Sequence, residues 1–171
     1  MENHSSKLLL LITKQYKSSL PKSLVLKKLL IWYDYFMSKD FKHEIKIYYE
    51  DTDAGGVVYY SNYLKFLERA RTEMLASIGL SNKKLLEEHK TLIIVKSCNI
   101  EYIAPAKLED KIQIYSSTET FNKASFELIQ NIKKDNNLIV KAKVKLVTVN
   151  KDGKPIKIPS ILEKKFNKYL S

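Results

Sequence analysis

The hydrophobic pattern becomes regular only after residue 40, where it predicts a succession of strands. Residues 43–49 place Ile45, Ile47 and Tyr49 on one face, which is the alternation of a half-buried strand. Four further alternating segments follow in the second half of the chain, separated by turn-forming residues. These segments cover residues 92–104, 111–121, 125–133 and 138–149.

One long helix is predicted between the first strand and the later ones. Its apolar residues recur at spacings of three and four: Tyr63, Leu67, Ala70, Met74 and Ile78. Ser61 or Asn62 can cap its start, and Gly79 fits the position just past its end. The apolar arc is wide, so we expect this helix to press into a sheet. Two shorter helices are predicted over residues 81–88 and 160–170.

The order of these elements predicts the fold class. A strand, a helix and then four antiparallel strands in a consecutive meander are typical of an α+β fold, in which an antiparallel sheet wraps around one helix. Such a sheet has two free edges. A free edge offers unpaired backbone groups to another chain, so we expect at least a dimer.

Residues 1–36 do not share this organisation. The apolar run at residues 8–12 is too short to span a bilayer, and the segment lacks the form of a signal peptide. Residues 23–36 could form an amphipathic helix on a membrane surface or on a partner. We favour the alternative that Met37 is the true start, which makes residues 1–36 a basic extension and residues 37–171 the domain.

Composition narrows the function classes. The chain has 30 Lys and Arg against 19 Asp and Glu, a net charge of +11. Only Arg69 and Arg71 are arginines and the lysines are spread along the chain, which argues against nucleic-acid binding. The single Cys98 cannot form an internal disulfide, which fits a reducing, cytoplasmic compartment, and we expect it to be a small buried residue.

The segment from Asp51 to Tyr60 concentrates the residues that could carry chemistry. Two carboxylates and two glycines precede the N-terminus of the long helix, where unpaired N–H groups can stabilise an oxyanion. The segment does not match an EF-hand calcium loop, because Leu64 stands at the twelfth position counted from Asp53, where an EF-hand needs Glu. We expect Asp51 to shape the loop through hydrogen bonds to the backbone. From the residues alone, an ordinary Asp-Gly turn remains an equal alternative.

Two segments resemble a known family. YYEDTDAGGVVYYSNYLKFLERARTEML, at residues 48–75, is similar to the 4-hydroxybenzoyl-CoA thioesterase family and, within it, to YbgC-like acyl-CoA thioesterases of the Tol-Pal system. EYIAPAKLED, at residues 101–110, resembles the family's second recurrent segment. The resemblance covers residues 41–150. It implies a hotdog fold with active sites at a dimer interface, and hydrolysis of an acyl-CoA thioester to a free acid and CoA.

The resemblance also implies roles for individual residues. Asp53 matches the catalytic aspartate, acting as base or nucleophile, and the backbone N–H of Tyr60 matches the group that holds the thioester oxygen. YbgC-like members often carry His in place of Tyr60, so no role for that His transfers. Gly56 matches the family's glycine. Tyr59 and Tyr63 are candidates for lining the acyl pocket, with aromatic core positions as the alternative for both, and Lys123 is a candidate contact for CoA phosphate.

Other functions stay open at this stage. A hotdog dehydratase needs an active-site His in its loop, and none lies between His43 and His89. A non-enzymatic acyl-CoA-binding or membrane-docking module is the alternative from another class. The family analogy implies no cofactor and no metal, acyl-CoA as substrate, a homodimer or homotetramer, and an acyl carrier protein or a Tol-Pal component as partner. Neither nucleic acid nor a transmembrane segment is expected, and the acyl chain length is left open.

Overall fold

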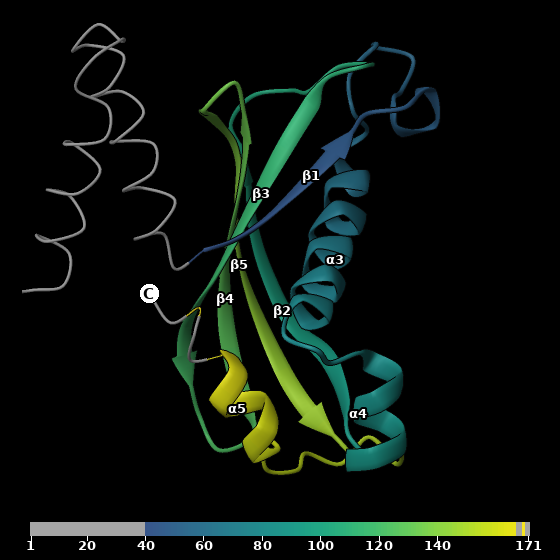
Figure 1. Cartoon of the computed structure of the whole chain (residues 1–171). Coiled ribbons are helices and arrows are strands. Elements are labelled where there is room, and N and C mark those ends of the chain that lie inside the picture. The colour runs from purple at the N-terminus through teal and green to yellow at the C-terminus, as the bar shows by residue number, and fades with distance from the viewer. Residues whose placement is uncertain (1–39, 167–168, 170–171) are drawn as a thin grey trace, which may run out of the picture. The chain divides into compact units, whose positions relative to one another are not determined.

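The structure is a computed structural model that describes residues 40–166 and 169 of the 171-residue chain. The predicted extension over residues 1–36 lies outside the described residues. Five strands form one antiparallel sheet (Figure 1): β1 (Phe41–Lys46), β2 (Leu92–Tyr102), β3 (Lys111–Phe121), β4 (Ser125–Lys134) and β5 (Asn137–Val149). Their order across the sheet is β1-β3-β4-β5-β2.

This order corrects one detail of the predicted topology. The consecutive meander holds for β3, β4 and β5, but β2 pairs with β5 instead of β3. The reason is that β3 already has β1 on one side and β4 on the other, so no edge of β3 is free. The edges of the described sheet are therefore β1 and β2.

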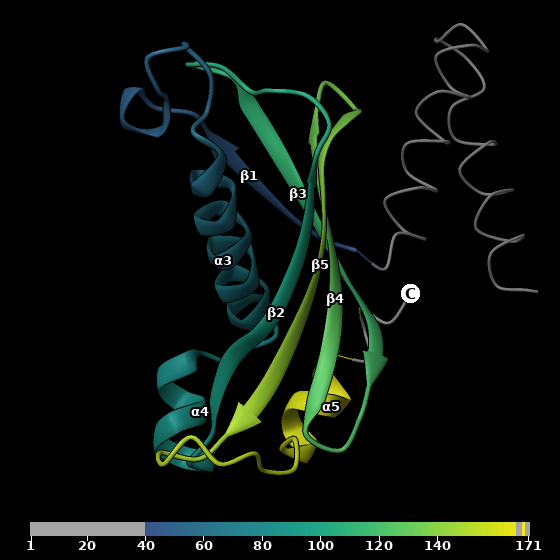
Figure 2. The same cartoon turned by 180° about the vertical axis from the view of Figure 1, so that it is seen from behind.

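The core lies between the sheet and the long helix α3 (Tyr60–Ser77), which covers one face of the sheet in both views (Figure 1 and Figure 2). Phe66, Leu67 and Met74 have no exposed surface, and they pack in one cluster with residues such as Ile114 and Leu128. Each such side chain stabilises the fold by roughly 1.5–3 kcal/mol on burial. The predicted hotdog arrangement, an antiparallel sheet wrapped around a central helix, is confirmed.

Only one of the two predicted ends of α3 is confirmed. Gly79 has a φ of 70° and stops the helix as expected. The predicted cap is wrong, because α3 starts at Tyr60 and includes Ser61 and Asn62, while Tyr59 is the N-cap and caps nothing with its side chain. The short helices are α4 (Asn82–His89) and α5 (Ser160–Phe166), whose predicted residues beyond 166 are not all described.

Two expectations about strands are also corrected. The first strand ends at Lys46, and Tyr49 belongs to a 3₁₀ turn, η1 (Tyr49–Asp51), where it is 82% exposed instead of facing the core. Cys98 was expected to be buried, but it is exposed because β2 is an edge strand.

Different loops lie at the two ends of the sheet. The loop between β1 and α3 lies at the end where β1 finishes and β3 begins (Figure 1). The β3–β4 turn, which carries Lys123, lies at the other end, together with α4 and α5. β3 runs the full distance between them, roughly 33 Å for ten residue steps.

Candidate active site

The segment between β1 and α3 is a closed loop. Thr52 and Val58 form an antiparallel bridge, and the N–H of Asp53 donates to the carbonyl of Val57 at 2.9 Å. At the neck of the loop, the N–H of Tyr59 donates to the carbonyl of Asp51 at 3.0 Å. The loop therefore leaves the sheet and returns to the start of α3 with its two arms hydrogen-bonded to each other.

Asp51 shapes the start of this loop, as predicted. Its carboxylate Oδ2 accepts from the N–H of Tyr48 at 2.9 Å and closes the η1 turn. Asp51 is only 6% exposed, which leaves its carboxylate little contact with solvent. The prediction that Asp51 acts on the backbone is confirmed.

Asp53 lies on the outer part of the loop and is exposed. Its Oδ1 accepts from the N–H of Gly55 at 2.8 Å, and no hydrogen bond to its Oδ2 is found among the described residues. The chain then turns back through Gly56, whose φ of 74° favours glycine and whose N–H donates to the carbonyl of Asp53 at 3.0 Å. One carboxylate oxygen is thus oriented by the backbone, and the other is available for chemistry.

The N-terminus of α3 supplies the complementary group. The N–H of Asn62 donates to the carbonyl of Tyr59 at 2.9 Å, but the N–H groups of Tyr60 and Ser61 have no acceptor in the described part of the chain. Unpaired N–H groups and the helix dipole make this point favourable for negative charge. It can stabilise an oxyanion.

A cleft of about 250 Å³ lies next to this helix start. Val58, Tyr60, Tyr63 and Tyr102 line it together with residues 103–105. The aromatic rings contact one another: the centroids of Tyr60 and Tyr102 are 6.2 Å apart, and those of Tyr63 and Tyr102 are 5.7 Å apart. The cleft wall is therefore mostly apolar and aromatic.

Two of these tyrosines are also fixed by hydrogen bonds. The buried hydroxyl of Tyr63 accepts from the N–H of Ala106 at 2.9 Å, and the hydroxyl of Tyr102 donates to the carbonyl of Tyr60 at 3.3 Å. Tyr63 is thus both a core residue and a cleft residue. The sequence reasoning missed Tyr102, although its place inside the second family segment was a usable signal.

The remaining predicted site residues lie apart from the cleft wall. Tyr59 is 44% exposed and is not among the residues that line the cleft. Its ring is tilted by 54° to the ring of Tyr60, and the two ring centroids are 4.7 Å apart. A side-chain hydrogen bond with Tyr60 raises the pKa of the Tyr59 phenol, and the charge of Asp53 adds to the effect. Within one chain, the structure does not bring Lys123 to Asp53, because they occupy opposite ends of the sheet.

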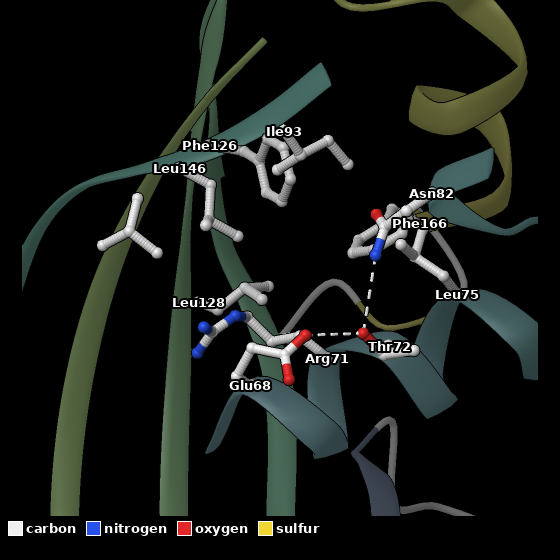
Figure 3. Close-up of a pocket in the computed structure, with 11 residues that line it drawn as sticks. Glu68, Arg71, Thr72, Leu75, Asn82, Ile93, Phe126, Leu128, Leu146 and Phe166 are labelled. Carbon is white, nitrogen blue, oxygen red and sulfur yellow. Dashed lines mark hydrogen bonds between the residues drawn. The ribbon is translucent and has the colours of Figure 1, made fainter. Parts of the chain in front are cut away.

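A second, smaller pocket of about 120 Å³ lies further along α3 (Figure 3). Its wall is apolar except for Glu68, Arg71, Thr72 and Asn82. Figure 3 shows Arg71 beside Leu128, and its Nη1 donates to the Oε1 of Gln130 at 2.9 Å.

Gln130 connects Arg71 to the core. Gln130 has no exposed surface, and its Nε2 donates to the hydroxyl of Ser116 and to the carbonyl of Leu67. Burial lowers the pKa of Arg71. Arg71 therefore links α3 to β4 of the sheet through its hydrogen bond to Gln130.

The described residues contain no group of three or more His, Cys, Asp and Glu side chains that could hold a metal ion. No helix in residues 40–166 is both long and apolar enough to cross a membrane. The described residues combine an exposed carboxylate on the loop, unpaired backbone N–H groups at the helix start and a neighbouring cleft with aromatic walls.

The antiparallel sheet wrapped around α3 defines a hotdog-fold protein. The model of the thioesterase-like superfamily matches residues 48–166, which is more than half of the chain. The chain belongs to this superfamily.

Individual relatives agree with this assignment. An acyl-CoA thioesterase YbgC from Haemophilus influenzae is 35% identical over 132 residues, which cover 77% of this chain and 97% of the relative. An acyl-CoA thioester hydrolase YbgC from Escherichia coli is 40% identical over 111 residues, which cover 64% of this chain and 82% of the relative. The crystal structure of a probable thioesterase from Bartonella henselae superposes with a TM-score of 0.68 at 30% identity, covering 70% of this chain and 99% of the other.

Proposed function

We propose that this protein is an acyl-CoA thioesterase, which hydrolyses the thioester of an acyl-CoA to a free carboxylic acid and CoA. The names of the Haemophilus influenzae and Escherichia coli relatives support this activity. The observation that carries the proposal is the pairing of groups on one closed loop: the Asp53 carboxylate on one arm and the unpaired N–H of Tyr60 after the other.

The proposed reaction uses these two groups together. The thioester oxygen accepts a hydrogen bond from the N–H of Tyr60, which stabilises the negative charge that develops there. Asp53 either takes a proton from the attacking water or attacks the carbonyl carbon itself. The carbon–sulfur bond then breaks and the CoA sulfur leaves and gains a proton. In the nucleophilic route, water hydrolyses the resulting anhydride and restores Asp53.

The substrate-contact roles are part of the same proposal. Tyr63 and Tyr60 line the cleft next to the helix start, where the acyl group would lie. Gly56 gives the loop its return turn. Tyr59 remains a candidate for contact with the acyl group and Lys123 for contact with CoA phosphate, and Lys123 could act only on a site formed by a second copy.

The direct test measures release of free thiol from a panel of acyl-CoAs of increasing chain length. The Asp53→Asn variant is expected to lose about a hundredfold or more in turnover, as expected for the removal of a base or nucleophile. Asp135→Asn, an exposed carboxylate in the β4–β5 turn, is the matched control and should behave like wild type. Near-normal turnover by Asp53→Asn would overturn the assignment of the site.

The same assay separates the enzymatic function from a binding function. If the wild-type protein releases no thiol from any acyl-CoA but still binds acyl-CoA in a calorimetric titration, the protein is an acyl-CoA-binding module. In that case the cleft and the helix N-terminus bind the thioester without cleaving it.

We also propose that two copies pair along β2. Among the described strands, β2 has a neighbour on one side only, and it exposes 45% of Ile94 and 49% of Val95. Light scattering on the full chain should give at least twice the monomer mass. Val95→Lys should shift it toward the monomer, whereas Leu138→Lys, on β5, should not. A monomeric wild-type protein would contradict the pairing.

Three further proposals rest on the family resemblance and the sequence. The working unit is residues 37–171, and an intact mass of the native protein that matches residues 1–171 would contradict a start at Met37. The protein acts in the cytoplasm. Its partner is an acyl carrier protein or a Tol-Pal component, and the net charge of +11 would favour an acidic one. Co-purification at low and high salt tests this partner.

A further inference from the structure

The carbonyl of Asp51 receives two hydrogen bonds at the neck of the loop. One comes from the N–H of Tyr59 at 3.0 Å, and the other comes from the side-chain amide Nδ2 of Asn62, also at 3.0 Å. Asp51 and Asn62 are each only 6% exposed. The neck is therefore held by a buried side chain in addition to the backbone.

Both reactive groups extend directly from this neck. Asp53 lies two residues beyond Asp51 on the outgoing arm, and Tyr60 lies one residue beyond Tyr59 on the returning arm. Asn62 is the third residue of α3 and is fixed to the helix by its own backbone. Its amide thus ties the arm that carries the carboxylate to the rigid helix that carries the N–H groups.

The direction of the hydrogen bond distinguishes this role from helix capping. A capping asparagine accepts from a backbone N–H of the first turn, whereas the amide of Asn62 donates to a carbonyl outside the helix. If the amide is lost, the carbonyl of Asp51 keeps the N–H of Tyr59, so no buried acceptor is left without a partner. Loss of the amide should therefore disturb the alignment of the reactive groups more than it reduces the stability of the fold.

We propose that Asn62 is a positioning residue of the hydrolytic site, which sets the placement of the Asp53 carboxylate relative to the N–H of Tyr60. This inference rests on the proposed function. Small misplacements of reacting groups reduce turnover strongly, with about a hundredfold loss for 1 Å. We expect the loss of the amide to act on kcat, because Asn62 is buried and does not line the cleft.

The first test compares two variants of Asn62 in the full chain. Asn62→Asp keeps the shape of the side chain but replaces the donor with a carboxylate, and Asn62→Ala removes both. Both should lower kcat by roughly tenfold or more while KM changes by less than about twofold. Asn62→Gln, which keeps the amide, should recover part of kcat. Equal kcat for wild type and Asn62→Asp would overturn the proposal.

A matched control separates positioning from general loosening of a loop. The Oδ1 of Asn150 accepts from the N–H groups of Asp152 and Lys154 and holds a different loop, which carries no site residue. Asn150→Ala should reduce thermal stability without changing kcat. If Asn150→Ala reduces kcat as much as Asn62→Ala does, the loss reflects folding and the proposal fails.

A double-mutant cycle with Asp53 identifies the group through which Asn62 acts. If Asn62 positions the carboxylate, Asn62→Ala should cause little further loss in the Asp53→Asn background. A full, independent loss in that background would overturn the proposal while leaving the thioesterase function intact. By contrast, absent wild-type turnover shows failure of the proposed function, and full turnover by Asp53→Asn shows failure of the site assignment together with this proposal.

Discussion

Gly55→Ala should separate activity from stability, because the added methyl group meets only the proposed catalytic carboxylate. A Cβ at position 55 would lie 3.0 Å from the Oδ1 of Asp53, and apart from the adjacent residues no other described residue has an atom within 4 Å of it. This separation is shorter than an ordinary van der Waals contact. The carboxylate must therefore move by a few tenths of an ångström, and its 2.8 Å hydrogen bond to the N–H of residue 55 must lengthen or break.

Gly55→Ala is expected to raise the stability of the protein and to lower its kcat. Gly55 does not have a positive φ, so alanine fits its backbone, and the exposed Asp53 side chain can move away at little cost. Replacing glycine by alanine at a compatible position stabilises a protein by about 0.4–1 kcal/mol through the unfolded state. The displaced carboxylate should lower kcat by roughly tenfold, in proportion to a shift well below 1 Å.

Thiol release at saturating acyl-CoA measures kcat, and denaturant unfolding of the same samples measures stability. Gly153→Ala is the matched control: Gly153 has a φ of 75° in a turn distant from the loop, so that variant should lose stability and keep wild-type kcat. Full kcat in Gly55→Ala would refute the reasoning, because the position of the Asp53 carboxylate would then be unimportant. A large loss of stability would refute the claim that only the carboxylate is affected.

Two further predictions concern stability. Arg71→Met leaves the buried Oε1 of Gln130 without its donor, so the free energy of unfolding should fall by about 1–3 kcal/mol, while Arg69→Met, at an exposed position, should change it little. Burial alone would raise the pKa of Asp110, but hydrogen bonds from Lys134 and from the N–H of Lys107 bring it below its usual value. Asp110→Asn should therefore destabilise the protein at neutral pH, and the difference should begin to shrink as pH falls below about 4, the pKa of the unfolded carboxyl, and vanish only below the lower pKa of the folded state. Unfolding curves at pH 7 and pH 3 check the sign.

Much of the fold could be predicted because local patterns determine it. The alternation along β5 and the three- and four-residue spacing of α3 each report burial on one face, and burial on one face requires a sheet and a helix in contact. The partner of β2 could not be predicted, because alternation reveals which face of a strand is buried but carries no information on its neighbour. The same limit explains the error on Cys98, which an edge position exposes.

The candidate site was also predictable only in part. The position of Asp53, before two glycines and a helix, was visible in the sequence as a break in regular structure. The part played by Asn62 was not, because an asparagine near a helix start is typical of a cap, and only the geometry shows that its amide donates away from the helix. Lys123 shows a third limit: its proposed contact with CoA depends on where a second copy lies, and one chain cannot specify that.

The two reactive groups of the proposed chemistry come from different parts of the chain. The oxyanion is served by the backbone N–H of Tyr60, so the side chain at that position is free to serve the cleft wall instead. The carboxylate must come from a side chain, and a side chain on a short loop has many accessible positions. The loop removes this freedom by three separate contacts: the Thr52–Val58 bridge, the N–H of Gly55 and the double hydrogen bond to the carbonyl of Asp51. The position of the Asp53 carboxylate is therefore set by backbone groups and one buried amide. For this reason, small changes at positions 55 and 62 are the sharpest tests of the site.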